Sequence, residues 1–249
     1  MTALIENLQS KMNSLDSLAD LTSRVLEYLP NVTTRSFEKN GYTISVSESA
    51  GATKYCRPVR QTLFIRDRGE FEERFQALKE LMNRSTAGTR SFNQEDHLVV
   101  DSCVYTMQQS VGVGLDFLSN PNSARKHTGN RFEELTRLLV TATGVKNKRV
   151  VLKIPYAKDA LYSAETDLVF SPFDSVRSHS THIEDREVIV SLKTSSKDRM
   201  GKIFVDKMLM ERFVEHPVKL IGIFLNDVQR KDTTGISYTF VSGLFMVYT

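Results

Sequence analysis

The amino-acid sequence predicts an α/β fold, with a mixed central sheet flanked by helices and a mainly helical N-terminal region. Residues 3–29 carry apolar side chains at helical spacing, which favours one or two amphipathic helices. After Pro121 the pattern becomes a helix, three apolar β-rich runs, a helix and a strand, an order typical of α/β domains. Hydrophobic residues form 40% of the 249 residues, which supplies a core and excludes a mainly disordered chain.

Three features bear on the cellular compartment. The apolar runs fall far short of the roughly 20 residues needed to span a bilayer, so no transmembrane helix is expected. The first residues lack a basic flank followed by an apolar stretch, so no secretory signal is expected. Cys56 and Cys103 form neither a disulfide framework nor a CxxC pair. We therefore expect a cytoplasmic protein that does not use a membrane as a partner.

Positive charge is concentrated in one segment. The whole chain has a net charge of only +3, but residues 122–158 hold nine basic residues and two acidic ones. Such a segment suits the phosphate backbone of a nucleic acid, and a solvated surface is the alternative. The nine are Arg125, Lys126, Arg131, Arg137, Lys146, Lys148, Arg149, Lys153 and Lys158.

The N-terminal elements are read from periodicity and from turn residues. Pro30 is expected to end the first helical stretch. Asn40-Gly41 is a hairpin signal before the strand 42–46. A further strand is expected at 62–65, followed by helices over 70–82 and 95–118.

The C-terminal half is expected to contain the sheet. A helix is predicted over 129–143, then strands at 149–154, 166–170 and 187–192. A helix over 198–214 and a strand over 218–225 follow, and 235–249 reads as a hairpin.

Asp167 and Lys193 are the first candidates for chemistry. Asp167 precedes the apolar run 168–170, and Lys193 follows the apolar strand 188–192. Ser191 and Lys193 are two positions apart, so in a strand they project from the same face. Charged groups at the ends of buried strands are costly unless they pair with each other or with a metal. The alternative is that both side chains reach water from the strand ends.

Asp206 is the third candidate because of its place on the following helix. Ile203, Met210 and Phe213 lie three before, four after and seven after it, so they share its helix face. A carboxylate on an apolar face needs a partner, and Lys193 or a cation shared with Asp167 would serve. A local pair with Lys202 or Lys207 is the alternative.

Two carboxylates and a lysine fit metal-assisted hydrolysis of a phosphodiester. Mg²⁺ prefers oxygen ligands and keeps several waters. It polarises the scissile phosphate and supplies hydroxide near neutral pH. A lysine can position the attacking water and stabilise charge in the transition state.

These residues carry a resemblance to a known family. The region 122–228 resembles the PD-(D/E)XK nucleases, and within them the CCGG-type restriction endonucleases, the group of EcoRII, PspGI and NgoMIV. In that group a small residue stands two before the lysine, as Ser191 does, and the acid moves to the next helix, as Asp206 does thirteen residues after Lys193. Residues 193–199 read KTSSKDR, similar to the group's K-x-x-x-(R/K)-D-R segment. Residues 125–133 read RKHTGNRFE, similar to its upstream F-E step, and Glu133 lies 34 residues before Asp167.

The resemblance implies a fold, an activity and roles for residues. It implies a restriction endonuclease-like fold, with the nuclease core at 121–249 and residues 1–120 as a dimerisation region or DNA clamp. It implies a type II site-specific deoxyribonuclease that cuts double-stranded DNA at a short G·C-containing palindrome and leaves 5′-phosphate ends. Such an enzyme would need Mg²⁺ and no nucleotide cofactor. It would act as a homodimer in a prokaryotic cytoplasm. Asp167 and Asp206 would hold the metal, with Glu133 in support, and Lys193 would assist the water.

The same resemblance implies which residues meet DNA. Lys197, Asp198 and Arg199 would read bases, and Arg125, Lys126 and Arg131 would contact the duplex. Arg199 can donate to guanine and Asp198 can accept from cytosine, which supports the reading role independently. The alternative is a helix N-terminus capped by Ser195 or Ser196, with Asp198 favouring the helix dipole.

Other readings of the chain remain open at this stage. A repair or recombination nuclease of the same superfamily and a non-cleaving DNA-binding module are the two alternatives. His179 and His182 lack a third ligand nearby and favour a polar loop over a zinc site. Gly112 and Gly114 lack the context of a phosphate-binding loop.

Overall fold

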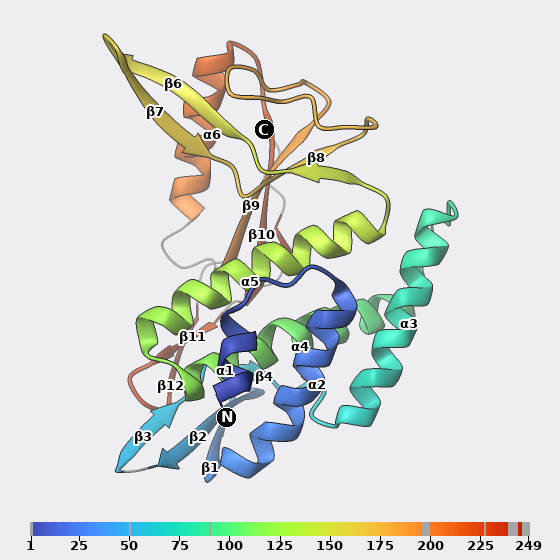
Figure 1. The fold of residues 1–249 in the computed structure, drawn as a ribbon, viewed down its shortest axis with the longest axis vertical. Coiled ribbons are helices and arrows are strands. Elements are labelled where there is room, and N and C mark those ends of the chain that lie inside the picture. The colour runs from blue at the N-terminus through green and yellow to red at the C-terminus, as the bar shows by residue number, and fades with distance from the viewer. Residues whose placement is uncertain are drawn as a thin grey trace. The chain divides into compact units, whose positions relative to one another are not determined.

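The computed structural model divides the chain into two compact units (Figure 1). It describes residues 2–49, 51–89, 91–195, 200–226, 228–238 and 244–245. Unit 1 comprises 1–143 and 228–238, and unit 2 comprises 144–227 and 239–249. Within the described residues, none of the helices combines the length and hydropathy that a bilayer crossing requires.

Unit 1 is built on five helices, and side chains cap the starts of four of them. The five helices are α1 (Thr2–Gln9), α2 (Leu15–Val32), α3 (Arg68–Thr86), α4 (Gln94–Leu118) and α5 (Pro121–Ala142). Ser14, Asp67, Asn93 and Asn120 each accept a hydrogen bond from a backbone N–H of the first turn, which satisfies a donor that has no partner within the helix. Because Asn120 caps and Pro121 suits a first helical position, α5 starts eight residues earlier than predicted.

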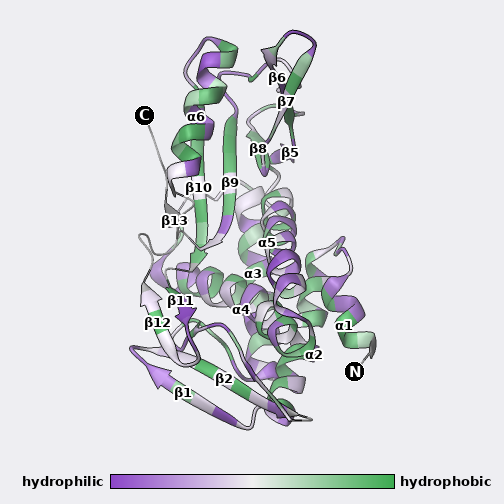
Figure 2. Ribbon diagram, turned by 90° about the vertical axis from the view of Figure 1, so that its left-hand side faces the viewer, coloured by the Kyte–Doolittle hydropathy of each residue, from purple (hydrophilic) through white to green (hydrophobic). Residues whose placement is uncertain are grey.

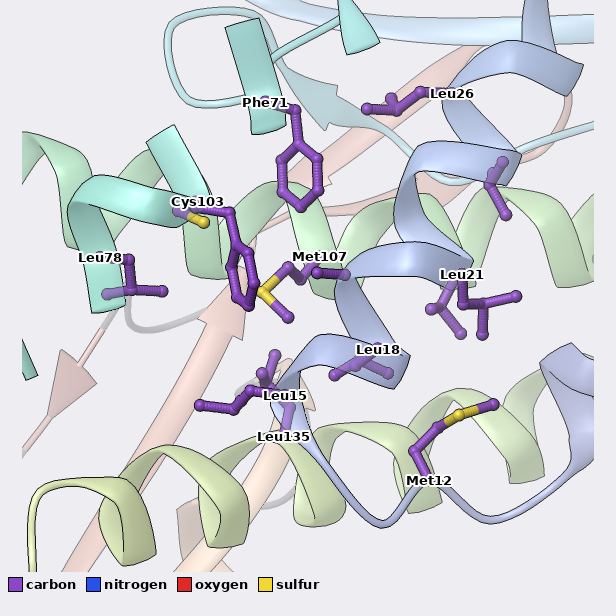
Figure 3. Packing of buried hydrophobic residues seen from close by; sticks show 14 of the residues in the cluster. Met12, Leu15, Leu18, Leu21, Leu26, Phe71, Leu78, Cys103, Met107 and Leu135 are labelled. Carbon is purple, nitrogen blue, oxygen red and sulfur yellow. The ribbon is translucent and has the colours of Figure 1, made fainter. Parts of the chain in front are cut away.

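The core of unit 1 surrounds α4. Met107 of α4 is fully buried, and Leu18 of α2, Phe71 of α3 and Leu135 of α5 belong to the same apolar cluster (Figure 3). Burial of this kind is the main contribution to folding. It also explains why α5 belongs to unit 1 rather than to the C-terminal half that starts at residue 121 in our sequence interpretation. Ala124, Leu135 and Leu138 of α5 belong to this cluster, and the apolar cluster described for unit 2 includes no residue of α5.

Unit 1 also holds a small antiparallel sheet that the sequence only partly predicts. Its strands are β1 (Arg35–Lys39), β2 (Tyr42–Ser49), β3 (Ala52–Tyr55) and β4 (Val59–Arg60), with β1, β3 and β4 pairing to β2. The expected hairpin turn is present, because Asn40 and Gly41 both have positive φ, at 50° and 79°. A second hairpin pairs β11 (Val228–Lys231) with β12 (Gly235–Tyr238).

Two local predictions in unit 1 are wrong. Pro30 does not end α2, which continues to Val32, since a proline in the last turn removes a single helical hydrogen bond. Residues 62–65 form a turn and loop instead of a strand, because the N–H of Phe64 donates to the Arg60 carbonyl and that of Ile65 to Thr106 Oγ1 on α4. The backbone N–H groups of this segment therefore bond within a turn and to α4, and they do not pair with a strand.

Gly112 has a structural role in α4. A Cβ atom there would lie 2.5 Å from the guanidinium of Arg57. That guanidinium forms a bidentate ion pair with Asp116, with Nε–Oδ2 at 2.8 Å and Nη2–Oδ1 at 2.9 Å. The glycine therefore makes room for an ion pair that ties the β-sheet side of unit 1 to α4.

Unit 2 contains a mixed five-stranded sheet in the order β13-β10-β9-β8-β5. These strands are β5 (Lys146–Lys148), β8 (Leu168–Ser171), β9 (Val188–Ser195), β10 (Lys219–Asn226) and β13 (Leu244–Phe245). β9 and β10 are parallel, and the other neighbours are antiparallel. Apolar residues run along the central strands β9 and β10 (Figure 2), as expected for strands buried on both faces. The predicted α/β class with a mixed sheet is confirmed.

Helix α6 (Met200–Val214) packs on this sheet. Ile203 and Met210 of α6 are buried in one apolar cluster with Leu220 and Phe224 of β10. A Cβ atom at Gly222 of β10 would come within 3.0 Å of Ile203 Cδ1, so the glycine allows close packing of the helix.

Two strand predictions in unit 2 need correction. The run 149–154 does not join the sheet, because β6 (Val151–Ala157) pairs with β7 (Ala160–Glu165) in a separate hairpin. The expected hairpin over 235–249 is also not formed, since β12 pairs with β11 and β13 pairs with β10. Residues 239–243 and 246–249 lie outside the described part of the chain.

Candidate active site

Asp167, Ser191 and Lys193 project from one face of the sheet in unit 2. Leu168 pairs with Val190 in the antiparallel β8–β9 ladder, so Asp167, one residue earlier, stands level with Ser191. Lys193 lies two residues further along β9 and shares that face. Strand alternation thus brings the predicted acid and lysine together.

The Asp167 carboxylate is held from β9. Its Oδ2 accepts from Lys193 Nζ at 2.5 Å and from the Leu192 N–H at 2.6 Å, with Ser191 Oγ at 3.5 Å. The side chains of Lys193 and Asp167 are 17% and 16% exposed, so the pair is largely shielded from water. Lys193 Nζ also donates to the Leu192 carbonyl at 2.9 Å. The ammonium is therefore fixed beside the carboxylate instead of reaching into water from the strand end.

Asp206 lines the same pocket as these residues. The pocket, of about 440 Å³, is bounded by the sheet face and by α6, which contributes Lys202, Ile203, Asp206 and Met210. Ile203, Asp206 and Met210 are spaced by three and four residues, the spacing of one helix face. The side chain of Asp206 is 29% exposed. An apolar face of α6 thus carries one carboxylate to the rim of the cavity.

The immediate partner of Asp206 is Lys202, one helical turn earlier. Lys202 Nζ lies 2.5 Å from Asp206 Oδ2, which is the local pair that the sequence left open as an alternative. Lys207, the other local candidate, is buried and instead bonds Glu211 and the Val218 carbonyl. Our site prediction did not include Lys202, although it lines the pocket. Its position four residues before Asp206, on the same helix face, could have indicated this.

The donor set of the pocket suits a hard cation that keeps its waters. Asp167 and Asp206 line the pocket, and so does Glu165, whose carboxylate pairs with Arg149 at 2.9 Å. In the described part of the chain, no group of three or more His, Cys, Asp or Glu is arranged to hold a metal. Mg²⁺ typically binds through one or two carboxylates and retains several waters, so the two aspartates fit it without a larger cage.

The remaining predicted site residues lie in unit 1 or outside the described residues. Lys197, Asp198 and Arg199 belong to 196–199, which lies outside the described residues. Glu133 is half-buried on α5 of unit 1.

Three predicted DNA contacts also lie on α5. Arg125 and Lys126 are exposed there. Arg131 is only 2% exposed and is paired with Glu134, which in turn accepts from the Met12 N–H. Arg131 thus links α5 to the chain between α1 and α2, and it is not presented to a duplex.

The histidines and the buried Glu187 serve the loop between β8 and β9. His179 and His182 exchange backbone hydrogen bonds, in agreement with the polar-loop reading. Glu187 is 1% exposed and accepts from the N–H groups of Arg177 and Ser178 and from Ser178 Oγ. Burial acts to raise the pKa of Glu187, but these hydrogen bonds outweigh it and the pKa is lowered.

Comparison with known proteins shows the fold. No protein-family model and no curated protein matches the chain. Among solved structures, the chain is similar to the crystal structure of the Type IIP restriction endonuclease Kpn2I, with a TM-score of 0.64 and 16% sequence identity. The match covers 97% of this chain and 81% of that chain. Together with the mixed sheet and its flanking helix, this similarity shows that the chain has a restriction endonuclease-like α/β fold.

Proposed function

We propose that this protein is a Mg²⁺-dependent type II site-specific deoxyribonuclease that cleaves double-stranded DNA. One observation carries the proposal. The start of β8, the strand β9 and the helix α6 bring Asp167, Lys193 and Asp206 to a single pocket, in a fold similar to that of a Type IIP restriction endonuclease. Carboxylates that can hold a metal, with an ordered ammonium in the same pocket, suit metal-assisted phosphodiester hydrolysis.

The residues divide the chemistry between them. Asp167 and Asp206 would hold Mg²⁺, which when bound supplies Lewis-acid polarisation of the phosphate and an activated water. The Lys193 ammonium lies on the Asp167 carboxylate, so it would orient the water there and stabilise negative charge on the phosphate. Asp206 would exchange its Lys202 partner for the cation, and Lys202 would then be available to a phosphate oxygen.

The finer features of the proposal follow from the sequence. Lys197, Asp198 and Arg199 would read a short G·C-containing palindrome, with Arg125 and Lys126 on phosphates. A two-fold DNA site is matched by a homodimer, and each subunit would leave a 5′-phosphate. We further propose that the enzyme works without a nucleotide cofactor in a prokaryotic cytoplasm. Arg131 is omitted from the DNA contacts because its side chain is buried.

The test is cleavage of plasmid DNA by the full chain with Mg²⁺ or with EDTA, followed by sequencing of the ends. We expect Mg²⁺-dependent cuts at one palindrome. Asp167→Ala and Lys193→Ala should each reduce the rate by about 10³-fold or more, because losing a metal ligand or the ammonium raises the barrier by several kcal/mol. Lys219→Ala, which removes an exposed charge from β10 outside the pocket, is the matched control.

The outcomes separate this function from its alternatives. Cleavage without sequence preference would indicate a repair or recombination nuclease. Binding of DNA without cleavage in Mg²⁺, unchanged by Lys193→Ala, would indicate a non-cleaving DNA-binding module. Full activity of either pocket variant would overturn the active-site assignment.

A further inference from the structure

The β6–β7 hairpin stands outside the five-stranded sheet of unit 2 and is anchored near its base. Leu152, Ile154 and Ala164 are buried in the apolar cluster of the unit. Thr166, the residue after β7, bonds the Val150 backbone through both its N–H and its hydroxyl group, which closes the base of the hairpin. Beyond this anchor the two strands project away from the other strands of the unit (Figure 1).

The projecting end carries large side chains that the core does not use. Tyr156 is 71% exposed, Leu161 58% and Tyr162 48%. Three such residues on a two-stranded ribbon expose apolar and aromatic surface without packing it, which is typical of a binding surface.

The same hairpin carries two lysines and two acidic residues, so its formal charges balance. Lys153 and Lys158 are exposed, and Lys153 Nζ bonds the neutral Ser163 hydroxyl at 2.8 Å. Neither lysine pairs with a carboxylate in the part of the chain that the structure describes. Of the two hairpin acids, Glu165 is paired with Arg149 and Asp159 occupies the turn with a φ of 59°. Both ammonium groups therefore remain available to phosphates, although the hairpin as a whole carries no net charge.

The hairpin leads directly into the candidate active site. Glu165, the last residue of β7, and Thr166 line the pocket with Asp167. From the turn at Asp159 to Glu165 an extended strand spans about 20 Å. That length corresponds to about six base pairs of duplex, at about 3.4 Å for each.

We propose that the β6–β7 hairpin is a DNA-binding arm that enters a groove of the duplex beside the scissile phosphate. A two-stranded β-ribbon fits the major groove. Lys153 and Lys158 bind phosphates, while Tyr156 and Tyr162 contact sugars and bases. Occupation by a second copy of the chain would instead make a dimer depend on these exposed side chains. The proposal deepens the proposed function and rests on it for the identity of the ligand as duplex DNA.

The test measures binding in EDTA, by fluorescence anisotropy of a labelled duplex of about three helical turns over a salt series. For Lys153→Ala/Lys158→Ala we expect the log–log salt slope to fall by about 2 and the affinity near 0.1 M salt to fall about 60-fold. Tyr156→Ala should weaken binding at every salt concentration and leave the slope unchanged. Circular dichroism and thermal unfolding check that these exposed substitutions leave the fold intact.

Arg212→Ala/Lys219→Ala is the matched control, since it removes two exposed charges from α6 and β10 of the same unit. The proposal predicts wild-type binding for this variant. Equal affinity and equal salt slope for the two double variants would overturn the assignment of the hairpin as a DNA-binding arm. Plasmid cleavage by the parent chain, and so the proposed function, would still stand. Loss of a dimer in sedimentation, with DNA binding unchanged, would assign the hairpin to a second copy instead. A parent chain that neither binds nor cuts any duplex would overturn both proposals.

Discussion

Replacing Lys193 by methionine tests the geometry of the candidate site independently of its activity. The substitution removes the ammonium and keeps most of the side-chain length. It leaves the Asp167 carboxylate with the Leu192 N–H at 2.6 Å as its one close donor among the contacts described above. Because Asp167 is only 16% exposed, water replaces the lost ammonium poorly.

The expected cost follows from the burial of the pair. Breaking a fully buried ion pair by removing one partner costs about 3–5 kcal/mol. Both side chains here keep about one sixth of their exposure, so we expect a loss of about 2 kcal/mol from the free energy of unfolding. Asp167→Asn/Lys193→Met removes both charges and should recover part of this loss, with a coupling energy of at least about 1 kcal/mol.

The assay is urea unfolding of wild type, both single variants and the double variant, with the slope m as a check that the same surface unfolds. Plasmid cleavage should be lost in all three variants, including the double variant whose stability recovers. Lys219→Met is the control for loss of an exposed lysine. A coupling energy below about 0.5 kcal/mol would refute the close contact between Asp167 and Lys193.

Two further predictions concern groups outside the candidate site. Because the folded protein lowers the pKa of Glu187, its carboxylate stabilises the fold above the ordinary glutamate pKa of about 4.3, and this contribution is lost as the pH falls through the lower folded value. Glu187→Gln should therefore lower the free energy of unfolding by about 1–3 kcal/mol at pH 7 and by much less near pH 3, and an equal loss at both pH values would contradict this account. Burial raises the pKa values of Cys56 and Cys103 to about 12, so both thiols should react with a thiol reagent at neutral pH only after unfolding, and rapid labelling of the native protein would contradict their burial.

Local patterns in the sequence were enough to predict the central part of the candidate site. Side chains alternate along a strand with a period of two, so Ser191 and Lys193 had to share a face wherever the strand was placed. The apolar residues after Asp167 and before Lys193 marked two buried strands, which the structure pairs as β8 and β9. The three-and-four spacing of Ile203, Asp206 and Met210 likewise indicated one helix face, and all three line the pocket.

Side-chain partners and strand pairing could not be predicted in the same way. Arg131 looked like part of a basic surface, but the approach of Met12 and Glu134 makes it a buried link. Residues 62–65 have the composition of a strand, yet the Thr106 hydroxyl on α4 holds them in a loop. In both cases the deciding contact comes from a distant part of the chain.

The sequence by itself therefore determined the α/β class, most of the helices and the common face of Ser191 and Lys193, because each depends on periodicity within one segment. The tertiary structure decided that Asp206 pairs with Lys202, that β6 and β7 form a hairpin outside the sheet, and that α5 packs in unit 1. A hydrogen bond or ion pair is set by which surfaces meet, and that depends on the burial of apolar area summed over the whole chain. No single segment contains that information.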